Sequence, residues 1–142
     1  MIGADTFIRD LKRGEQIEMI LLEVIQKKYP KAYKIDGYFK DYDLFVPEIG
    51  KSIEVKSDEK SKETGNIVVE IEFNGKPSAL STTKADYWVW WDGEKYTWFD
   101  VDSIKKCILE TNPKLCSFIG NGDSKTKKAY LIKKDILYNY SL

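Results

Sequence analysis

The sequence predicts one mixed domain of the α/β or α+β class, with helices flanking a mixed central sheet. Two patterns carry this prediction: apolar residues recur at helical spacing through the first 29 residues, and short runs of β-forming residues follow, separated by turn residues. Because 142 residues is the length of one ordinary domain, residues 1–142 are expected to form a single unit.

The N-terminal half is expected to be a helix followed by strands. Residues 5–29 are predicted to form one long amphipathic helix, or two helices broken near Gly14, that ends at Pro30. The charged residues 58–65 lack apolar periodicity and are predicted to form a solvated loop. The expected strands cover residues 32–39, 42–46, 52–56 and 66–73.

The C-terminal half is expected to add a strand pair and a helix. The predicted order is a turn, a short helix, two aromatic strands, a second helix and a last strand, over residues 74–77, 78–84, 87–91, 96–101, 102–110 and 129–133. The aromatic strands flank an Asp-Gly-Glu turn with hairpin chemistry. Asp102 or Ser103 is expected to cap the second helix.

Composition excludes several function classes. Lys and Arg together number 23, as do Asp and Glu, so the net charge gives no argument for a polyanionic partner. The chain contains no histidine, which excludes Ser-His-Asp and Cys-His triads and Cys₂His₂ zinc sites. Cys107 and Cys116 form no Cys-x-x-Cys pair, and no apolar run approaches the ~20 residues that span a bilayer. We therefore expect free thiols, a cytoplasmic location and no membrane partner.

The most informative segment is the hairpin expected from the second and third strands. Residues 47–50 form a four-residue connection bounded by proline and glycine, so Val46 is expected to pair with Lys51. In that register Asp43 lies directly opposite Glu54. Directly opposed Cβ atoms are only ~5 Å apart, so the two carboxylates would repel each other unless a proton or a cation lies between them.

These residues suit a metal-dependent hydrolase. Because strand side chains alternate, Asp43, Glu54 and Lys56 would share one face of the hairpin. Mg²⁺ prefers oxygen ligands, which makes the two carboxylates and the backbone carbonyl of Val55 candidate metal ligands. Lys56 would orient or deprotonate the attacking water, or neutralise charge in the transition state. The alternative is a surface hairpin whose charged side chains are simply solvated.

Asp43 followed by Glu54-Val55-Lys56 on the next strand resembles the PD-(D/E)XK nuclease superfamily, in particular its small phage-type and Holliday-junction-resolvase-like members. The predicted element order is similar to the restriction-endonuclease-like αβββαβ core over residues 14–91. The resemblance implies a Mg²⁺-dependent DNA endonuclease of a bacterial, archaeal or phage-infected cell, in which Mn²⁺ can substitute. It also implies that Asp43 and Glu54 bind the metal and that Lys56 is catalytic. Tyr42 stands where the motif name has proline.

Members of this superfamily often add a glutamate from the first helix, four residues after a glycine. Gly14 and Glu18 have this spacing, and Glu15 lies one turn away as the alternative. Both could equally belong to an exposed helix face. Glu70 and Glu72 share one strand face and could add a further acid near the metal, or face solvent.

Residues 75–88 also resemble a segment that approaches DNA in phage-type members. Lysines and hydroxyl side chains at a helix start suit a phosphate, which makes Lys76, Ser78, Thr83 and Lys84 candidate nucleic-acid contacts. Ordinary helix capping is the alternative for the hydroxyl groups.

Two other functions stay open from the sequence. The first is a catalytically inactive nucleic-acid-binding module on the same fold, and the second is a small interaction or inhibitor protein, which the neutral net charge favours. A homodimer is a further expectation, because an enzyme that cuts both strands of a duplex needs two sites. The sequence does not distinguish DNA from RNA, or endonuclease from exonuclease.

Overall fold

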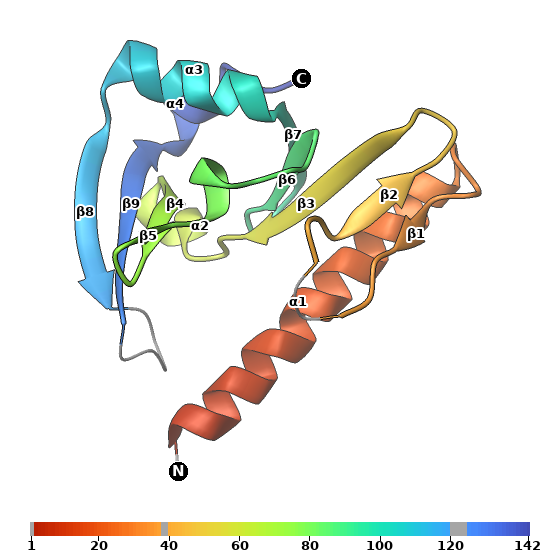
Figure 1. Ribbon diagram of the computed structural model, residues 1–142, viewed down its shortest axis with the longest axis horizontal. Coiled ribbons are helices and arrows are strands. Elements are labelled where there is room, and N and C mark those ends of the chain that lie inside the picture. The colour runs from red at the N-terminus through yellow and green to blue at the C-terminus, as the bar shows by residue number, and fades with distance from the viewer. Residues whose placement is uncertain (1, 38–39, 120–124) are drawn as a thin grey trace.

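The computed structural model describes residues 2–37, 40–119 and 125–142, with side chains for Arg9 and from Leu11 onward (Figure 1). Within these ranges the helices are α1 (Ile2–Gln26), α2 (Ser61–Thr64), α3 (Val101–Thr111) and α4 (Lys134–Tyr138), with one 3₁₀ turn, η1 (Ala79–Ser81). The strands are β1 (Tyr33–Lys34), β2 (Leu44–Val46), β3 (Lys51–Ser57), β4 (Asn66–Phe73), β5 (Lys76–Pro77), β6 (Tyr87–Trp91), β7 (Tyr96–Asp100), β8 (Lys114–Ile119) and β9 (Thr126–Lys133).

The strands form two sheets. The first has the order β1-β2-β3-β6-β7, in which the β3–β6 pair is parallel and the others are antiparallel. The second has the order β5-β4-β9-β8 and is entirely antiparallel. The predicted mixed α/β class with a mixed sheet is therefore confirmed. The second sheet was not expected from the sequence.

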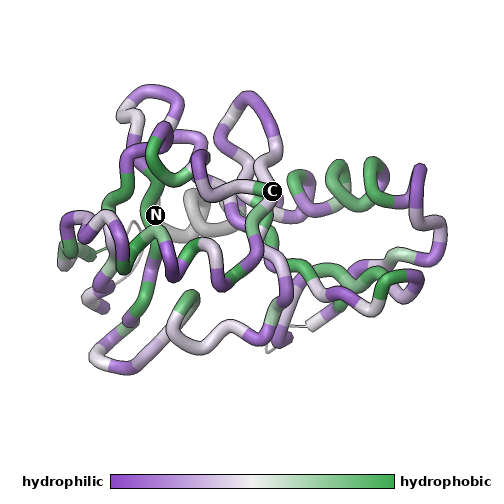
Figure 2. Tube along the Cα trace, turned by 90° about the horizontal axis from the view of Figure 1, so that it is seen from above, coloured by the Kyte–Doolittle hydropathy of each residue, from purple (hydrophilic) through white to green (hydrophobic). Residues whose placement is uncertain are grey.

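Helix α1 covers one face of the first sheet. Ile17, Leu21 and Ile25 recur every four residues, so they lie on one side of the helix, and all three are buried. The buried cluster that joins α1 to β2, β3 and β6 consists of Leu21, Leu22, Ile25, Ala32, Leu44, Val46, Ile53 and Val89. Figure 2 shows hydrophobic residues on both the helix and the strands that it faces.

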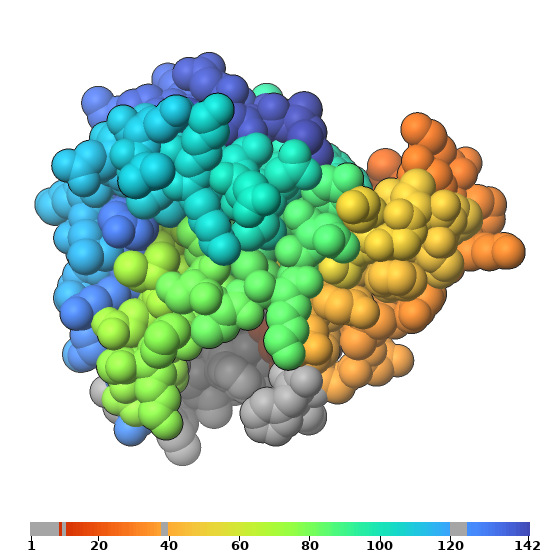
Figure 3. Space-filling model, turned by 45° about the horizontal axis from the view of Figure 1, so that its top comes forward, coloured from red at the N-terminus to blue at the C-terminus, as the bar shows by residue number. Residues whose placement is uncertain are grey.

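The other face of the first sheet packs against the second sheet, α3 and α4. Trp88 and Trp90 lie on this side, whereas Val89 between them faces α1, as the alternation of a strand requires. Their cluster also contains Ile67, Val69, Leu80, Ala85, Phe99, Val101, Ile104, Cys107, Ile132 and Leu137. In Figure 3 the β2–β3 hairpin, coloured orange to yellow, stands out beside the body formed by later residues.

Several predicted elements need correction. Helix α1 runs through Gly14 without a break. The expected loop 58–65 contains α2, in which the Ser61 hydroxyl donates to the Asp58 carbonyl at 2.6 Å and is buried. The expected helix 78–84 is only the η1 turn.

The predicted ends of other elements also differ. Strand β1 is shorter than the expected strand 32–39, of which residues 38 and 39 lie outside the described residues. Helix α3 begins at Val101, so Asp102 and Ser103 lie inside it and neither is its N-cap. Three further elements were missed: β5, which lies in the expected turn 74–77, β8, whose side chains are mostly exposed at a sheet edge, and the short helix α4.

Among the described residues, no helix combines the length and the apolar character that crossing a membrane requires.

Candidate functional site

The β2–β3 hairpin has the register that its turn predicts. Val46 pairs with Lys51 and Leu44 pairs with Ile53. One residue before β2, the Asp43 amide donates to the Ile53 carbonyl at 2.9 Å, one residue out of the register of the ladder, and the Asp43 side chain is hydrogen-bonded to that of Glu54. The aliphatic residues of the hairpin are buried under α1, so the acidic residues take the other side of each strand.

Asp43 is held in place by its surroundings. It is buried, and its Oδ2 accepts a hydrogen bond from the Val55 amide at 2.7 Å. Its Oδ1 lies 3.0 Å from Lys40 Nζ. Burial alone would raise the pKa of Asp43, but hydrogen bonds from Glu54, the Val55 amide and Lys40 hold that pKa below its usual value. Asp43 is therefore an ionised and oriented carboxylate at neutral pH.

Glu54 behaves in the opposite way. Burial, the hydrogen bond with Asp43 and the charge of Asp43 raise the pKa of Glu54 to about 8, although Lys56 and Lys40 act against the shift. At neutral pH the Asp43–Glu54 pair therefore shares one proton, as two carboxylates in close contact do when no metal separates them.

The first helix contributes Glu18 rather than Glu15 to this cluster. The Glu18 side chain is 15% exposed and interacts with Asp43. The Glu15 side chain is exposed. Burial and the Asp43 charge raise the pKa of Glu18 to about 7. Carboxylates from α1, the segment before β2, and β3 therefore meet at one place, although the three positions are far apart in the sequence.

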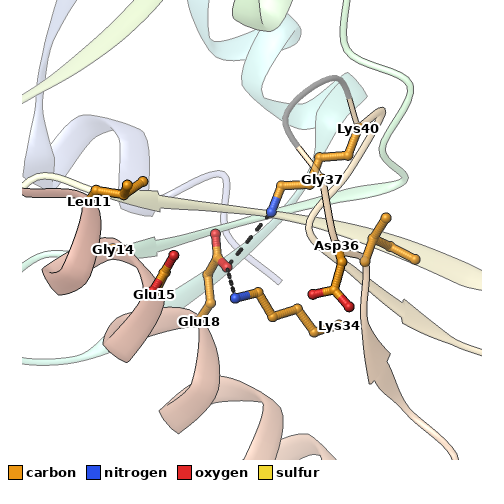
Figure 4. A pocket seen from close by; sticks show the side chains of 9 residues that line it. Leu11, Gly14, Glu15, Glu18, Lys34, Asp36, Gly37 and Lys40 are labelled. Carbon is orange, nitrogen blue, oxygen red and sulfur yellow. Dashed lines mark ion pairs between the residues drawn. The ribbon is translucent and has the colours of Figure 1, made fainter. Parts of the chain in front are cut away.

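Two lysines of the site were missed by sequence reasoning. Lys34 Nζ lies 3.6 Å from Glu18 Oε2, and Lys40 Nζ lies 3.9 Å from the same oxygen (Figure 4). They line a cavity of about 530 Å³ together with Glu18 and Glu15. Neither lysine belongs to a motif, and it is the tertiary structure that brings Lys34 of β1 and Lys40, which precedes β2, to Glu18 of α1. The sequence therefore carried no local signal for them.

Lys56 lies at the end of the same strand face as Glu54. Its Nζ lies 4.9 Å from the centre of a Trp88 ring, and it lines a second cavity of about 250 Å³ together with Glu70 and Lys127. Glu70 accepts a hydrogen bond from Ser78 and pairs with Lys127 at 3.7 Å, while Glu72 pairs with Lys128 at 3.3 Å. Both glutamates are thus paired with lysines of β9 rather than joined to the Asp43–Glu54 cluster.

The predicted nucleic-acid contacts fall into two kinds. The hydroxyl groups are used inside the protein: Ser78 Oγ donates to Glu70 at 2.8 Å, and Thr83 Oγ1 accepts from the Trp88 indole N–H at 3.0 Å. The lysines are exposed, with Lys76 on β5 and Lys84 Nζ 3.7 Å from Asp41. Each hydroxyl group therefore already has a partner within the protein, whereas both lysines are exposed.

Among the side chains that the structure describes, no three acidic or cysteine groups are arranged to hold a metal ion. The ammonium group of Lys40 lies beside Asp43 and Glu18. A cation is thus already present next to these carboxylates, but it belongs to the chain itself.

Comparison with models of protein families, with curated proteins and with solved structures found no match to this chain.

Proposed function

We propose that the chain is a divalent-metal-dependent nuclease that hydrolyses phosphodiester bonds in DNA, acting as an endodeoxyribonuclease. One observation carries the proposal: Asp43, Glu54 and Glu18 converge from three segments, and the pKa values of the two glutamates are raised to about 8 and about 7. Carboxylic acids whose pKa values are raised by burial and by like charges are typical of functional sites. A bound cation would relieve the repulsion between their ionised forms. We propose the restriction-endonuclease-like core on the same grounds.

The residues fit a hard divalent cation. The donor set consists of carboxylate oxygens, which Mg²⁺ and Mn²⁺ prefer. The proton shared by Asp43 and Glu54 and the ammonium of Lys40 are positive charges that the cluster already attracts. We assign Asp43, Glu54 and the Val55 carbonyl as ligands, with Glu18 as a further carboxylate. When bound, Mg²⁺ would polarise the scissile phosphate and lower the pKa of a coordinated water.

The other residues have complementary roles in the proposed reaction. Lys56 orients the attacking water, or accepts its proton, or neutralises the negative charge that develops on the phosphate. The Val55 amide fixes the orientation of the Asp43 carboxylate through its 2.7 Å hydrogen bond. The exposed Lys76 and Lys84 bind backbone phosphates, which positions the strand without reading its bases. Hydrolysis joins a water oxygen to phosphorus and releases the bridging oxygen with a proton.

The expected cellular setting belongs to the same proposal. A DNA nuclease with free cysteines suits the cytoplasm of a bacterial, archaeal or phage-infected cell. A homodimer would supply a second site for the opposite strand, and sedimentation with and without duplex DNA measures this.

The decisive experiment is cleavage of supercoiled plasmid, single strands and a four-way junction in Mg²⁺, Mn²⁺ or EDTA. Wild type is compared with Lys56→Met and with the control Lys133→Met, which removes an exposed lysine from the end of β9. We expect metal-dependent cutting that falls at least about 100-fold in Lys56→Met and is unchanged in the control. Cleavage of RNA oligonucleotides in parallel tests the choice of DNA.

No cleavage by folded wild type on any substrate would contradict the enzyme. Metal-independent DNA binding in that case would favour the inactive binding module, whereas absence of both activities would favour an interaction protein.

A further inference from the structure

Lys40 occupies a position that no motif assigns. Its Nζ lies 3.0 Å from Asp43 Oδ1 and 3.9 Å from Glu18 Oε2, and its side chain is 22% exposed. Its charge also acts on Glu54. One ammonium group thus interacts with all three acidic side chains of the proposed metal site.

This position conflicts with a divalent cation. A metal ion needs the carboxylate oxygens as ligands, and Lys40 now uses one oxygen of Asp43 as a hydrogen-bond acceptor. Two cations a few Å apart in a partly buried site also repel strongly. The ammonium group and a metal ion would therefore compete for the same carboxylate oxygens.

Lys40 differs from its neighbour Lys34 in two ways. Lys34 lies in β1 and pairs with Glu18, whereas Lys40 lies outside any helix or strand and contacts both Glu18 and Asp43. Both line the 530 Å³ cavity in front of the cluster, where Figure 4 shows their ends on either side of Glu18. The cavity offers space into which the Lys40 side chain can withdraw.

We propose that Lys40 is an internal counter-ion that competes with the divalent metal for Asp43 and Glu18, and so sets the metal affinity of the site. The inference rests on the proposed function, since it requires a metal at these carboxylates. In the metal-free protein Lys40 limits the repulsion between the acids, and a metal ion binds only when it displaces the ammonium group. Removal of the Lys40 charge therefore strengthens metal binding.

The test measures Mn²⁺ binding directly, by electron paramagnetic resonance of free Mn²⁺ and by calorimetry, without substrate. Lys40→Met keeps the aliphatic stem and removes the charge, and Lys40→Arg keeps the charge. Lys133→Met is the matched control, because it changes the net charge equally and removes an exposed lysine at the end of β9. Asp43→Asn is made in the wild-type and Lys40→Met backgrounds to identify the site.

We expect Lys40→Met to bind Mn²⁺ at least about tenfold more tightly than wild type, Lys40→Arg to bind it as weakly as wild type, and Lys133→Met to match wild type. Asp43→Asn should abolish the tight binding. If wild type binds Mn²⁺ through Asp43 and Lys40→Met has the same affinity, the counter-ion inference is wrong and the metal site stands. If neither wild type nor folded Lys40→Met binds Mn²⁺, both the inference and the proposed metal-dependent function are wrong. Lys40→Gln repeats the comparison if Lys40→Met does not fold.

Discussion

The ammonium group of Lys56 lies over an indole ring of Trp88, 4.9 Å from the ring centre, and the indole N–H in turn donates to Thr83 Oγ1 at 3.0 Å. A buried tryptophan with a satisfied N–H has a fixed orientation, so it also fixes the direction of the lysine above it. Thr83 thereby affects the proposed catalytic lysine through one intervening side chain.

Thr83→Val is expected to destabilise the fold by about 1–3 kcal/mol, because it leaves the buried Trp88 N–H without its acceptor. Urea unfolding measures this loss. Affinity for a DNA duplex should stay at the wild-type value, because the hydroxyl is used inside the protein. A large loss of DNA affinity in a variant of normal stability would instead identify Thr83 as a nucleic-acid contact.

Glu18→Gln is expected to lower Mn²⁺ affinity and DNA cleavage about tenfold or more, since it removes one carboxylate from the cluster. Glu15→Gln is the matched control on the same helix and should have little effect, because Glu15 is exposed. Equal losses in both variants would mean that general attraction of cations to α1, rather than a defined ligand position, explains the effect.

Glu54→Gln is expected to stabilise the metal-free protein in EDTA at high pH. The pKa of Glu54 is raised to about 8 in the fold, so the folded state keeps a proton that the unfolded state has lost. The stability of wild type must therefore fall as pH rises from about 4.5 to about 8, by the linkage of protonation to unfolding. Glutamine does not titrate, so the free energy of unfolding of the variant should rise relative to that of wild type by at least about 1 kcal/mol between pH 5 and pH 9. Urea unfolding across this range that gives a constant difference would contradict the assignment.

Asp92→Asn is expected to show the reverse pH dependence. Asp92 is buried at the β6–β7 turn, where it accepts the Glu94 and Lys95 amides and the Tyr138 hydroxyl. Burial alone would raise the pKa of Asp92, but these hydrogen bonds lower it. The contribution of Asp92 to the free energy of unfolding is therefore present above the pKa of the unfolded state, about 3.8. It is lost as pH falls through the lower pKa of the folded state. The variant should be less stable by about 1–3 kcal/mol at pH 7, with a smaller difference at pH 3.

Lys76→Ala is expected to weaken DNA binding about equally for all sequences and to reduce the salt dependence of the affinity by about one charge. Lys84→Ala should have a smaller effect, because Asp41 already offsets part of its charge. Fluorescence anisotropy at several salt concentrations measures both. If the dependence of DNA affinity on salt concentration is the same for Lys76→Ala as for wild type, β5 is not part of the proposed DNA-binding surface.

The sequence was sufficient to predict those parts of the site whose geometry is fixed by local chemistry. The four-residue connection after Val46 determined the register of the hairpin, and the register brought Asp43 to Glu54. It was insufficient where tertiary contacts decide. Lys40 lies in an irregular segment whose path depends on α1, and β8 carries exposed apolar residues at a sheet edge, so neither has the periodicity that sequence reasoning requires.

The parallel pairing of β3 with β6 also affects how the chain is made. Strand β3, which carries Glu54, pairs with β6 only after the chain has passed through residues 58–86, which lie outside the first sheet. Pairing between distant segments is slow, because the entropy of closing the loop is lost before contacts compensate for it. During synthesis, β3 would therefore be an edge strand of the sheet at first. Asp43 and Glu54 would become buried only after Trp91, the last residue of β6, had left the ribosome.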